Sequence, residues 1–125
     1  MFELTINGNV YQFNFGMGFL REINKAVSAP VDGLPDVKRN IGLRYKVLCI
    51  MDGDPEALVD VLDAANKGQK PRADRAMLDS YIDDEETDVD ALCNEVLDFL
   101  KRANATKKTV NLLLEELEKR RAAAN

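Results

Sequence analysis

Two glycines near the N-terminus could shape a phosphate-binding turn. They form Gly16-Met17-Gly18, between a predicted strand and a predicted helix. Glycine-rich turns at such a place bind nucleotide phosphates through backbone N–H groups. The dinucleotide fingerprint requires a further glycine where this chain has Arg21, and no Gly-Lys-Ser/Thr follows as it would in a P-loop. We therefore interpret the two glycines as a flexible joint between the strand and the helix.

A run of acids over residues 84–95 could bind calcium. Acids occupy positions 1, 3, 5, 7 and 12 of a loop that starts at Asp84, namely Asp84, Glu86, Asp88, Asp90 and Glu95. An EF-hand requires glycine at position 6 for its sharp turn, and this chain has Val89 there. A helix that starts with Thr87 as its N-cap explains the same acids, because a helix N-terminus attracts negative charge. The sequence therefore predicts no metal site.

Nucleophilic catalysis lacks its usual base in this chain. Histidine is absent, which removes Ser-His and Cys-His pairs and the commonest ligand of transition metals. Cys49 and Cys93 both stand among apolar residues at helical spacing, so we interpret them as reduced, buried thiols of a cytoplasmic protein. We expect no catalytic residue, no cofactor site and no enzyme activity.

A β-hairpin is the first element that would position these residues. Asn7-Gly8 is a strong signal for a two-residue turn, because both residues tolerate positive φ. A lone two-stranded ribbon is marginally stable, so one of its faces should pack on helices. The register around the turn places five large apolar residues on that face: Phe2, Leu4, Ile6, Tyr11 and Phe13.

Helices are predicted over most of the remaining chain. Apolar periodicity predicts them over residues 16–27 and 36–51. In the second, Val37, Ile41, Leu43, Leu48 and Ile50 are apolar, and Gly42 suggests a close helix contact. Residues 29–35 are predicted to be a turn-rich linker. Four further helices are predicted. One starts at Asp54-Pro55-Glu56 and the next covers about residues 73–83. The third starts at Thr87, and the last follows a break at residues 104–106.

The predicted fold class is therefore α+β and mostly α, with an N-terminal two-stranded β-hairpin followed by about five or six helices in one layer-bundle. We expect a single domain over residues 1–125. Within it, residues 1–15 would be the hairpin, residues 16–104 the helical core and residues 105–125 a C-terminal helix.

The net charge of −5 is spread unevenly along the chain. Residues 52–98 carry four Lys/Arg against fifteen Asp/Glu, whereas residues 99–125 carry seven against three. This asymmetry fits a protein partner or head-to-tail self-association, and it fits equally a solvated acidic face that keeps the protein soluble. The acidic middle predicts no nucleic-acid partner. The longest apolar run, residues 47–51, is too short to cross a membrane, so no membrane partner is predicted either.

Two long stretches resemble the tail assembly chaperones of long-tailed phages and prophages of Gram-positive bacteria. They are FELTINGNVYQFNFGMGFLREINK and GLRYKVLCIMDGDPEALVDVLDAAN. The shared features are the aromatic hairpin, the Gly-x-Gly-Phe-Leu-Arg-Glu joint, the Gly-Leu-Arg-Tyr helix and the Gly-Asp-Pro-Glu-Ala-Leu helix start. The resemblance covers roughly residues 1–118.

The resemblance implies a non-enzymatic assembly factor. Such a factor binds the tape measure protein in the cytoplasm of the bacterial host, keeps its apolar helical length from aggregating, helps recruit the tail tube protein and is absent from the mature virion. It implies no catalytic residue. A structural tail component, such as a tail-completion or connector protein, stays open as an alternative. A small DNA-binding regulator would need a basic recognition helix, for which residues 36–46 are the candidate.

The final helix holds the candidate partner-binding residues. Helix-in-groove contact requires an exposed apolar strip flanked by polar residues. Four leucines of this helix spread more widely than one buried stripe requires: Leu112, Leu113, Leu114 and Leu117. The alternative is that all four close the core of their own chain. We also expect a homo-oligomer, because an open-edged ribbon and segregated charge favour self-association.

Overall fold

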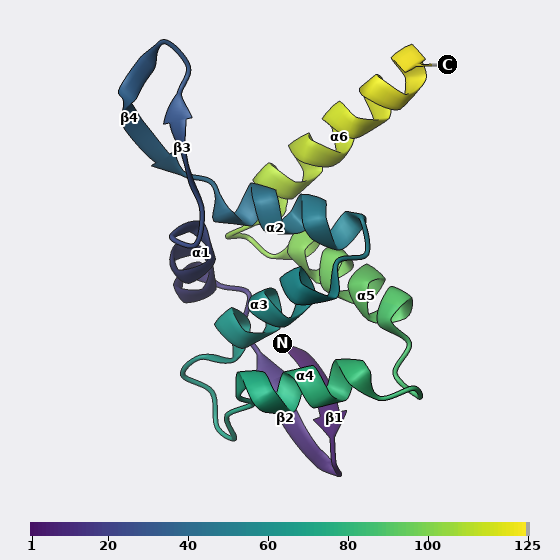
Figure 1. Ribbon diagram of the computed structural model, residues 1–125. Helices are drawn as coiled ribbons and strands as arrows, with labels where there is room; N and C mark the ends of the chain where they lie inside the picture. Colours follow the sequence, from purple (N-terminus) through teal and green to yellow (C-terminus); the bar gives the residue numbers. More distant parts are fainter. Residues whose placement is uncertain (125) are drawn as a thin grey trace.

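The computed structural model describes residues 1–124, so Asn125, the last residue of the predicted C-terminal helix, lies outside the described residues. Over residues 1–124 the chain forms two β-hairpins and six α-helices (Figure 1). The α+β, mostly helical fold class is thus confirmed. The second hairpin is a feature that the sequence pattern did not predict.

The N-terminal hairpin is confirmed in its turn, its register and its buried face. Strands β1 (Phe2–Ile6) and β2 (Asn9–Phe13) are antiparallel, with Phe2 opposite Phe13 and Leu4 opposite Tyr11. The turn residues Asn7 and Gly8 have φ of 53° and 81°, as this turn requires. All five predicted inward residues are buried. The backbone N–H of Asn14 donates to the carbonyl oxygen of Ala65 at 2.8 Å, which ties the hairpin to the helical layer.

The predicted linker over residues 29–35 and the predicted helix start at Asp36 are wrong. An antiparallel hairpin of β3 (Ser28–Val31) and β4 (Leu34–Asn40) occupies this segment, and Gly33 makes its turn with a φ of 78°. The helix prediction depended on Val37 and Ile41 at a spacing of four residues. Two residues at helical spacing do not fix a helix when pairing across a turn satisfies the same backbone groups.

Helices α1 (Met17–Asn24) and α2 (Gly42–Met51) are both shorter than predicted. The candidate recognition helix over residues 36–46 is therefore divided between β4 and the start of α2. The predicted close contact at Gly42 is confirmed, because this residue lies against the backbone of α1. Asn24 adds a polar link, since its side-chain oxygen accepts from the backbone N–H of Leu43 at 3.0 Å.

Helix α3 (Pro55–Asn66) lies in the middle of the helical layer (Figure 1) and contacts β2, α1, α2 and α4. Its predicted start is confirmed: the side chain of Asp54 accepts from the backbone N–H of Glu56 at 2.9 Å, and Pro55 occupies the first turn. Most of its apolar residues are buried, so α3 forms the centre of the core.

The C-terminal half contains α4 (Arg75–Asp83), α5 (Val89–Arg102) and α6 (Lys107–Ala124). Thr87 is not the N-cap of α5. Asp88 caps it by accepting from the N–H of Ala91 at 3.0 Å, while the hydroxyl of Thr87 donates to the carbonyl oxygen of Tyr81 at 2.7 Å. The threonine therefore closes the α4–α5 turn, and the aspartate after it, an equally good cap, starts the helix.

The break between α5 and α6 is confirmed. Buried Thr106 fixes it, because its hydroxyl donates to the carbonyl oxygen of Leu100 at 2.6 Å. Over residues 1–124, none of the helices is both long enough and apolar enough to span a bilayer.

Candidate partner-binding surfaces

The four predicted leucines of α6 do not share one surface. Leu113 is 5% exposed and lies in the core, whereas Leu112 is 49% exposed. Leu114 and Leu117 are half-buried. Consecutive residues of an α-helix point about 100° apart, so three adjacent leucines cannot all face one partner. Of the four, Leu112 is the residue that is most available for contact.

Helix α6 packs on the body of the protein only up to about Leu117. It contacts α5 and α2, and Arg44 of α2 forms an ion pair of 3.7 Å with Glu116. Every residue from Glu118 to Ala124 is exposed. Figure 1 shows this part of α6 extending away from the other helices.

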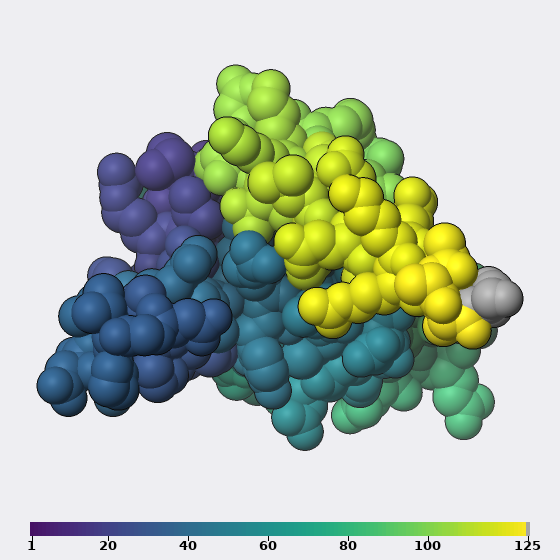
Figure 2. All heavy atoms as spheres, turned by 90° about the horizontal axis from the view of Figure 1, so that it is seen from above, coloured from purple at the N-terminus to yellow at the C-terminus, as the bar shows by residue number. Residues whose placement is uncertain are grey.

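The β3–β4 hairpin is a second projection. All seven residues of β4 are exposed, including Leu34 and Val37. Val37 belongs to the segment 36–46, which was expected to carry much of the apolar core. Figure 1 shows the hairpin and α6 projecting toward the same end of the molecule, and Figure 2 shows α2 between them on that face. Helix α2 also carries large exposed apolar residues, Tyr45 and Leu48.

An apolar groove lies where the Gly16-Met17-Gly18 joint meets the end of α5. Its volume is about 500 Å³, and its lining includes buried Phe13 and Phe15 together with Phe99. Two exposed methionines, Met1 and Met17, border it. Methionine side chains are flexible and polarisable, so they adapt to apolar partners of different shape.

The groove also has one charged side chain at its edge. The Arg102 guanidinium lies 4.7 Å from the centre of the Phe99 ring, where it interacts with the ring's negative face. Sequence reasoning missed this groove, because Phe13 and Phe15 come from the end of β2 and the segment after it, whereas Phe99 comes from α5, far along the chain. The one available signal was Met17, a large apolar residue between two glycines.

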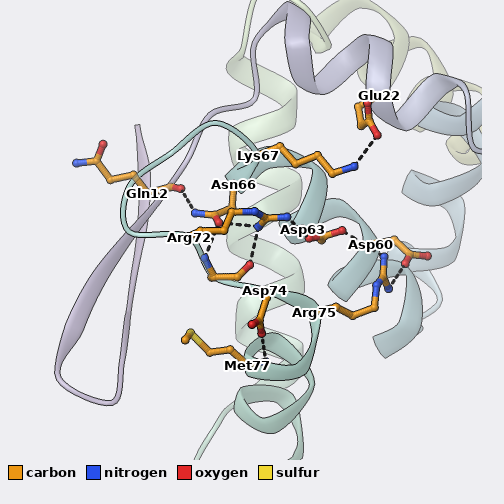
Figure 3. A network of polar contacts seen from close by, with 11 residues as sticks. Gln12, Glu22, Asp60, Asp63, Asn66, Lys67, Arg72, Asp74, Arg75 and Met77 are labelled. Carbon is orange, nitrogen blue, oxygen red and sulfur yellow. Dashed lines mark hydrogen bonds and ion pairs between the residues drawn. The ribbon is translucent and has the colours of Figure 1, made fainter.

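A polar network along α3 holds the elements together (Figure 3). The side chain of Asn66 is fully buried; its amide nitrogen donates to the carbonyl oxygen of Gln12 at 2.8 Å. Its oxygen accepts from the N–H of Ala73 at 2.6 Å and from Arg72 at 2.7 Å. One side chain thereby connects the hairpin, α3 and the segment before α4.

Asp60 makes the second connection in this network. It accepts from Lys46 at 2.8 Å and from Arg75 at 2.6 Å, so it links α2, α3 and α4. Burial raises the pKa of Asp60, but the hydrogen bonds from Lys46 and Arg75 outweigh burial, and the net pKa is lowered. These charges are matched within the chain, which indicates a positioning role rather than chemistry.

The acidic run and the cysteines do not form a reactive site in the described part of the chain. Over residues 1–124, no three His, Cys, Asp or Glu side chains are grouped as metal ligands would be. Cys93 is buried and Cys49 half-buried, and both are free thiols. Burial raises the pKa of the Cys93 thiol, which disfavours the reactive thiolate.

The fold and these surfaces define a small, mostly helical protein with exposed apolar residues on two projections and in one groove, an arrangement typical of a protein that binds other proteins. Residues 3–115 match the family described as phage tail assembly chaperone protein, TAC. The chain belongs to this family, as the resemblance implied. Comparisons with curated proteins and with solved structures find no significant match.

Proposed function

We propose that this chain binds the tape measure protein of its phage and keeps it soluble in the host cytoplasm while the tail tube protein assembles. The chain then leaves before the virion is complete, and it acts without catalysis. Membership of the tail assembly chaperone family supports the proposal. The observation that carries it is the apolar groove at Met17, because a protein that shields apolar helices requires an exposed apolar surface of its own.

The groove suits one face of an amphipathic helix. Such a helix presents apolar side chains at positions i, i+3 and i+4, and the groove offers aromatic rings with methionines at its border. Arg102 at the edge forms an ion pair of 2.8 Å with Asp98 of the same helix, so the rim of the groove on this side is polar. We place a second contact on α6 at Leu112, the most exposed of the four leucines. Leu114 and Leu117 are half-buried and point to another side of the helix, and Leu113 lies in the core.

Co-expression with the tape measure protein from the same genome tests the proposal. The wild-type chain should keep the tape measure protein in the supernatant and co-purify with it. Met17→Asp should abolish both effects, and Leu112→Asp should weaken them, because each places a charge on an apolar contact. Val10→Asp is the matched control: Val10 is 48% exposed and Met17 50% exposed, but Val10 lies on the outer face of the N-terminal hairpin.

Two outcomes would overturn the proposal. If the wild-type chain leaves the tape measure protein insoluble, the chaperone activity is absent. If Val10→Asp impairs solubility as much as Met17→Asp, the groove is not the contact. Purified virions provide a separate test, because stoichiometric amounts of the chain in them would instead indicate a structural tail component.

A further inference from the structure

A second cavity adjoins the groove at Met17. Its volume is about 150 Å³, and it shares the lining residue Ala105 with the groove. Met17 borders the groove, whereas Leu20 and Asn24 line the second cavity. These three residues lie on one face of α1, because they are three and four residues apart in a helix. The groove and the cavity therefore follow one another along this face of α1.

Two arginines make the second cavity positive, and we call it the arginine cavity. Arg39 of β4 and Arg44 of α2 line it, and none of its described lining residues is acidic. Among the ion pairs of residues 1–124, none involves Arg39. Arg44 pairs with Glu116, but 3.7 Å is too long for a hydrogen bond, so its N–H donors stay available. Both arginines also line a cavity of about 360 Å³ at the β3–β4 hairpin, together with one acid, Asp32.

We propose that the helix bound in the groove at Met17 continues over the arginine cavity, where an acidic side chain of the partner pairs with Arg39 and Arg44. This inference rests on the proposed function, because it adds a charged contact to the same groove. Guanidinium groups donate charge-assisted hydrogen bonds to carboxylates, and two arginines can donate to one carboxylate. The partner is thereby an amphipathic helix with an acid beyond one end of its apolar contact.

The length of α1 sets the spacing of the partner's residues. The two ends of its lining face, Met17 and Asn24, are about 10 Å apart along the helix axis, at about 1.5 Å per residue. A partner helix that runs beside α1 covers this length in about two turns, in either direction. We therefore expect the acid about seven residues from the apolar side chain that binds in the groove, on the same face of the partner helix.

Two peptides test the charged contact without the tape measure protein. Each is an acetylated and amidated alanine-rich helix of about 21 residues, with leucines on one face at its centre. The first peptide has a glutamate about seven residues from the leucines toward each end, so that both directions of binding are covered. The second peptide has glutamine at these two positions. Fluorescence anisotropy of the labelled peptides measures the affinity of the full chain for each.

We expect the wild-type chain to bind the glutamate peptide about fivefold more tightly than the glutamine peptide, and high salt should reduce this preference. The chain has a net charge of −5, so its overall field opposes the preference and only local cations can produce it. Arg39→Gln and Arg44→Gln should each reduce the preference, and the double variant should abolish it. Glu116→Gln should increase the preference, because it releases Arg44 from its ion pair.

Lys38→Gln is the matched control for Arg39→Gln. It removes one positive charge from the same strand, but adjacent strand residues point to opposite faces, and Lys38 lines neither the groove nor the arginine cavity. The control should keep the preference of the wild type.

Two results would overturn the inference while the proposed function stands: the wild-type chain binds both peptides equally well, or Lys38→Gln lowers the preference as much as Arg39→Gln does. If neither peptide binds, the groove does not accept an apolar helix, and the proposed function fails together with the inference. Unchanged binding of the glutamine peptide by each variant confirms that the variant is folded.

Discussion

Gly42 at the start of α2 lies directly against the carbonyl oxygen of Ile23 in α1. A Cβ atom added at residue 42 would stand 1.7 Å from that oxygen and 2.9 Å from the Cα atom of Asn24. The contact closes the base of the β3–β4 hairpin, whose two ends are also joined by a hydrogen bond of 2.8 Å from the N–H of Ile41 to the oxygen of Val27. The hairpin therefore projects from a rigid base.

Gly42→Ala should lower the free energy of unfolding by about 2 kcal/mol or more, because α1 and α2 must move apart to admit a methyl group. Urea denaturation followed by circular dichroism measures it. Gly18→Ala is the control, since nothing lies within 4 Å of its added Cβ atom, and alanine favours the helix there. If Gly42→Ala is as stable as the wild type, α1 and α2 are not packed so closely at residue 42 that a methyl group is excluded.

Asn66→Ala should destabilise the protein by about 2–4 kcal/mol, because it leaves the buried Ala73 N–H without its partner and removes the bond to the Gln12 carbonyl. Thermal and urea denaturation give the value. Asn111→Ala provides the comparison: Asn111 also donates to backbone oxygens but is exposed, so its loss should cost below about 1 kcal/mol. A cost for Asn66→Ala no larger than this would show that the network is dispensable.

Leu113→Ala should lower the free energy of unfolding by about 2–5 kcal/mol, as for other buried leucines. Leu112→Ala should change the free energy of unfolding by about 0.5 kcal/mol or less, since the Leu112 side chain is half exposed. Chemical denaturation of both variants under the same conditions measures their free energies of unfolding. Reversed values would mean that α6 packs with the other leucine inward.

Asp60 should make stability depend on pH in the acidic range. Its folded-state pKa is lowered from the ordinary value of 3.8, so its contribution is present above about that pH and is lost as pH falls through the lower folded pKa. Asp60→Asn should therefore be less stable than wild type from pH 7 to pH 5, and the difference should shrink below pH 4. Denaturation curves of both proteins over this pH range test the prediction. A stability difference that grows on acidification would contradict it.

Removal or addition of small ligands should leave stability unchanged. The acidic run lacks the glycine of an EF-hand loop, and the Gly16-Met17-Gly18 joint lacks the residues of a phosphate-binding turn. Melting curves with EDTA, calcium or ATP should superimpose on the curve without additions. A rise of several degrees with calcium or ATP would reveal a binding site.

Much of the fold follows from short, local signals in the sequence. Asn7-Gly8 determines a turn whose register places the apolar residues of both strands on one face, and Asp54-Pro55 determines the start of α3. Both signals act through backbone dihedral angles and nearby N–H groups, so they do not depend on distant residues. The break before α6 is local in the same way, because Thr106 bonds a carbonyl six residues earlier.

The candidate site was predicted far less well than the fold. The sequence indicated an apolar partner surface on α6, yet it could not tell exposed Leu112 from buried Leu113, because only the rotation of α6 on α5 and α2 decides which leucine faces inward. The groove at Met17 was missed altogether. Its walls come together only when β2 and α5 pack, so no local pattern contains it.

The N-terminal hairpin, the predominance of helices and the uneven charge could all be read from the amino-acid sequence. Turn chemistry and apolar periodicity act locally, and charge follows from a count of ionisable residues. Tertiary structure decided the β3–β4 hairpin, where weak helical spacing at Val37 and Ile41 yielded to strand pairing across Gly33. It also decided which apolar residues remain exposed. Burial is a property of packed elements, and identical residue types become core or surface according to the neighbour that the fold places against them.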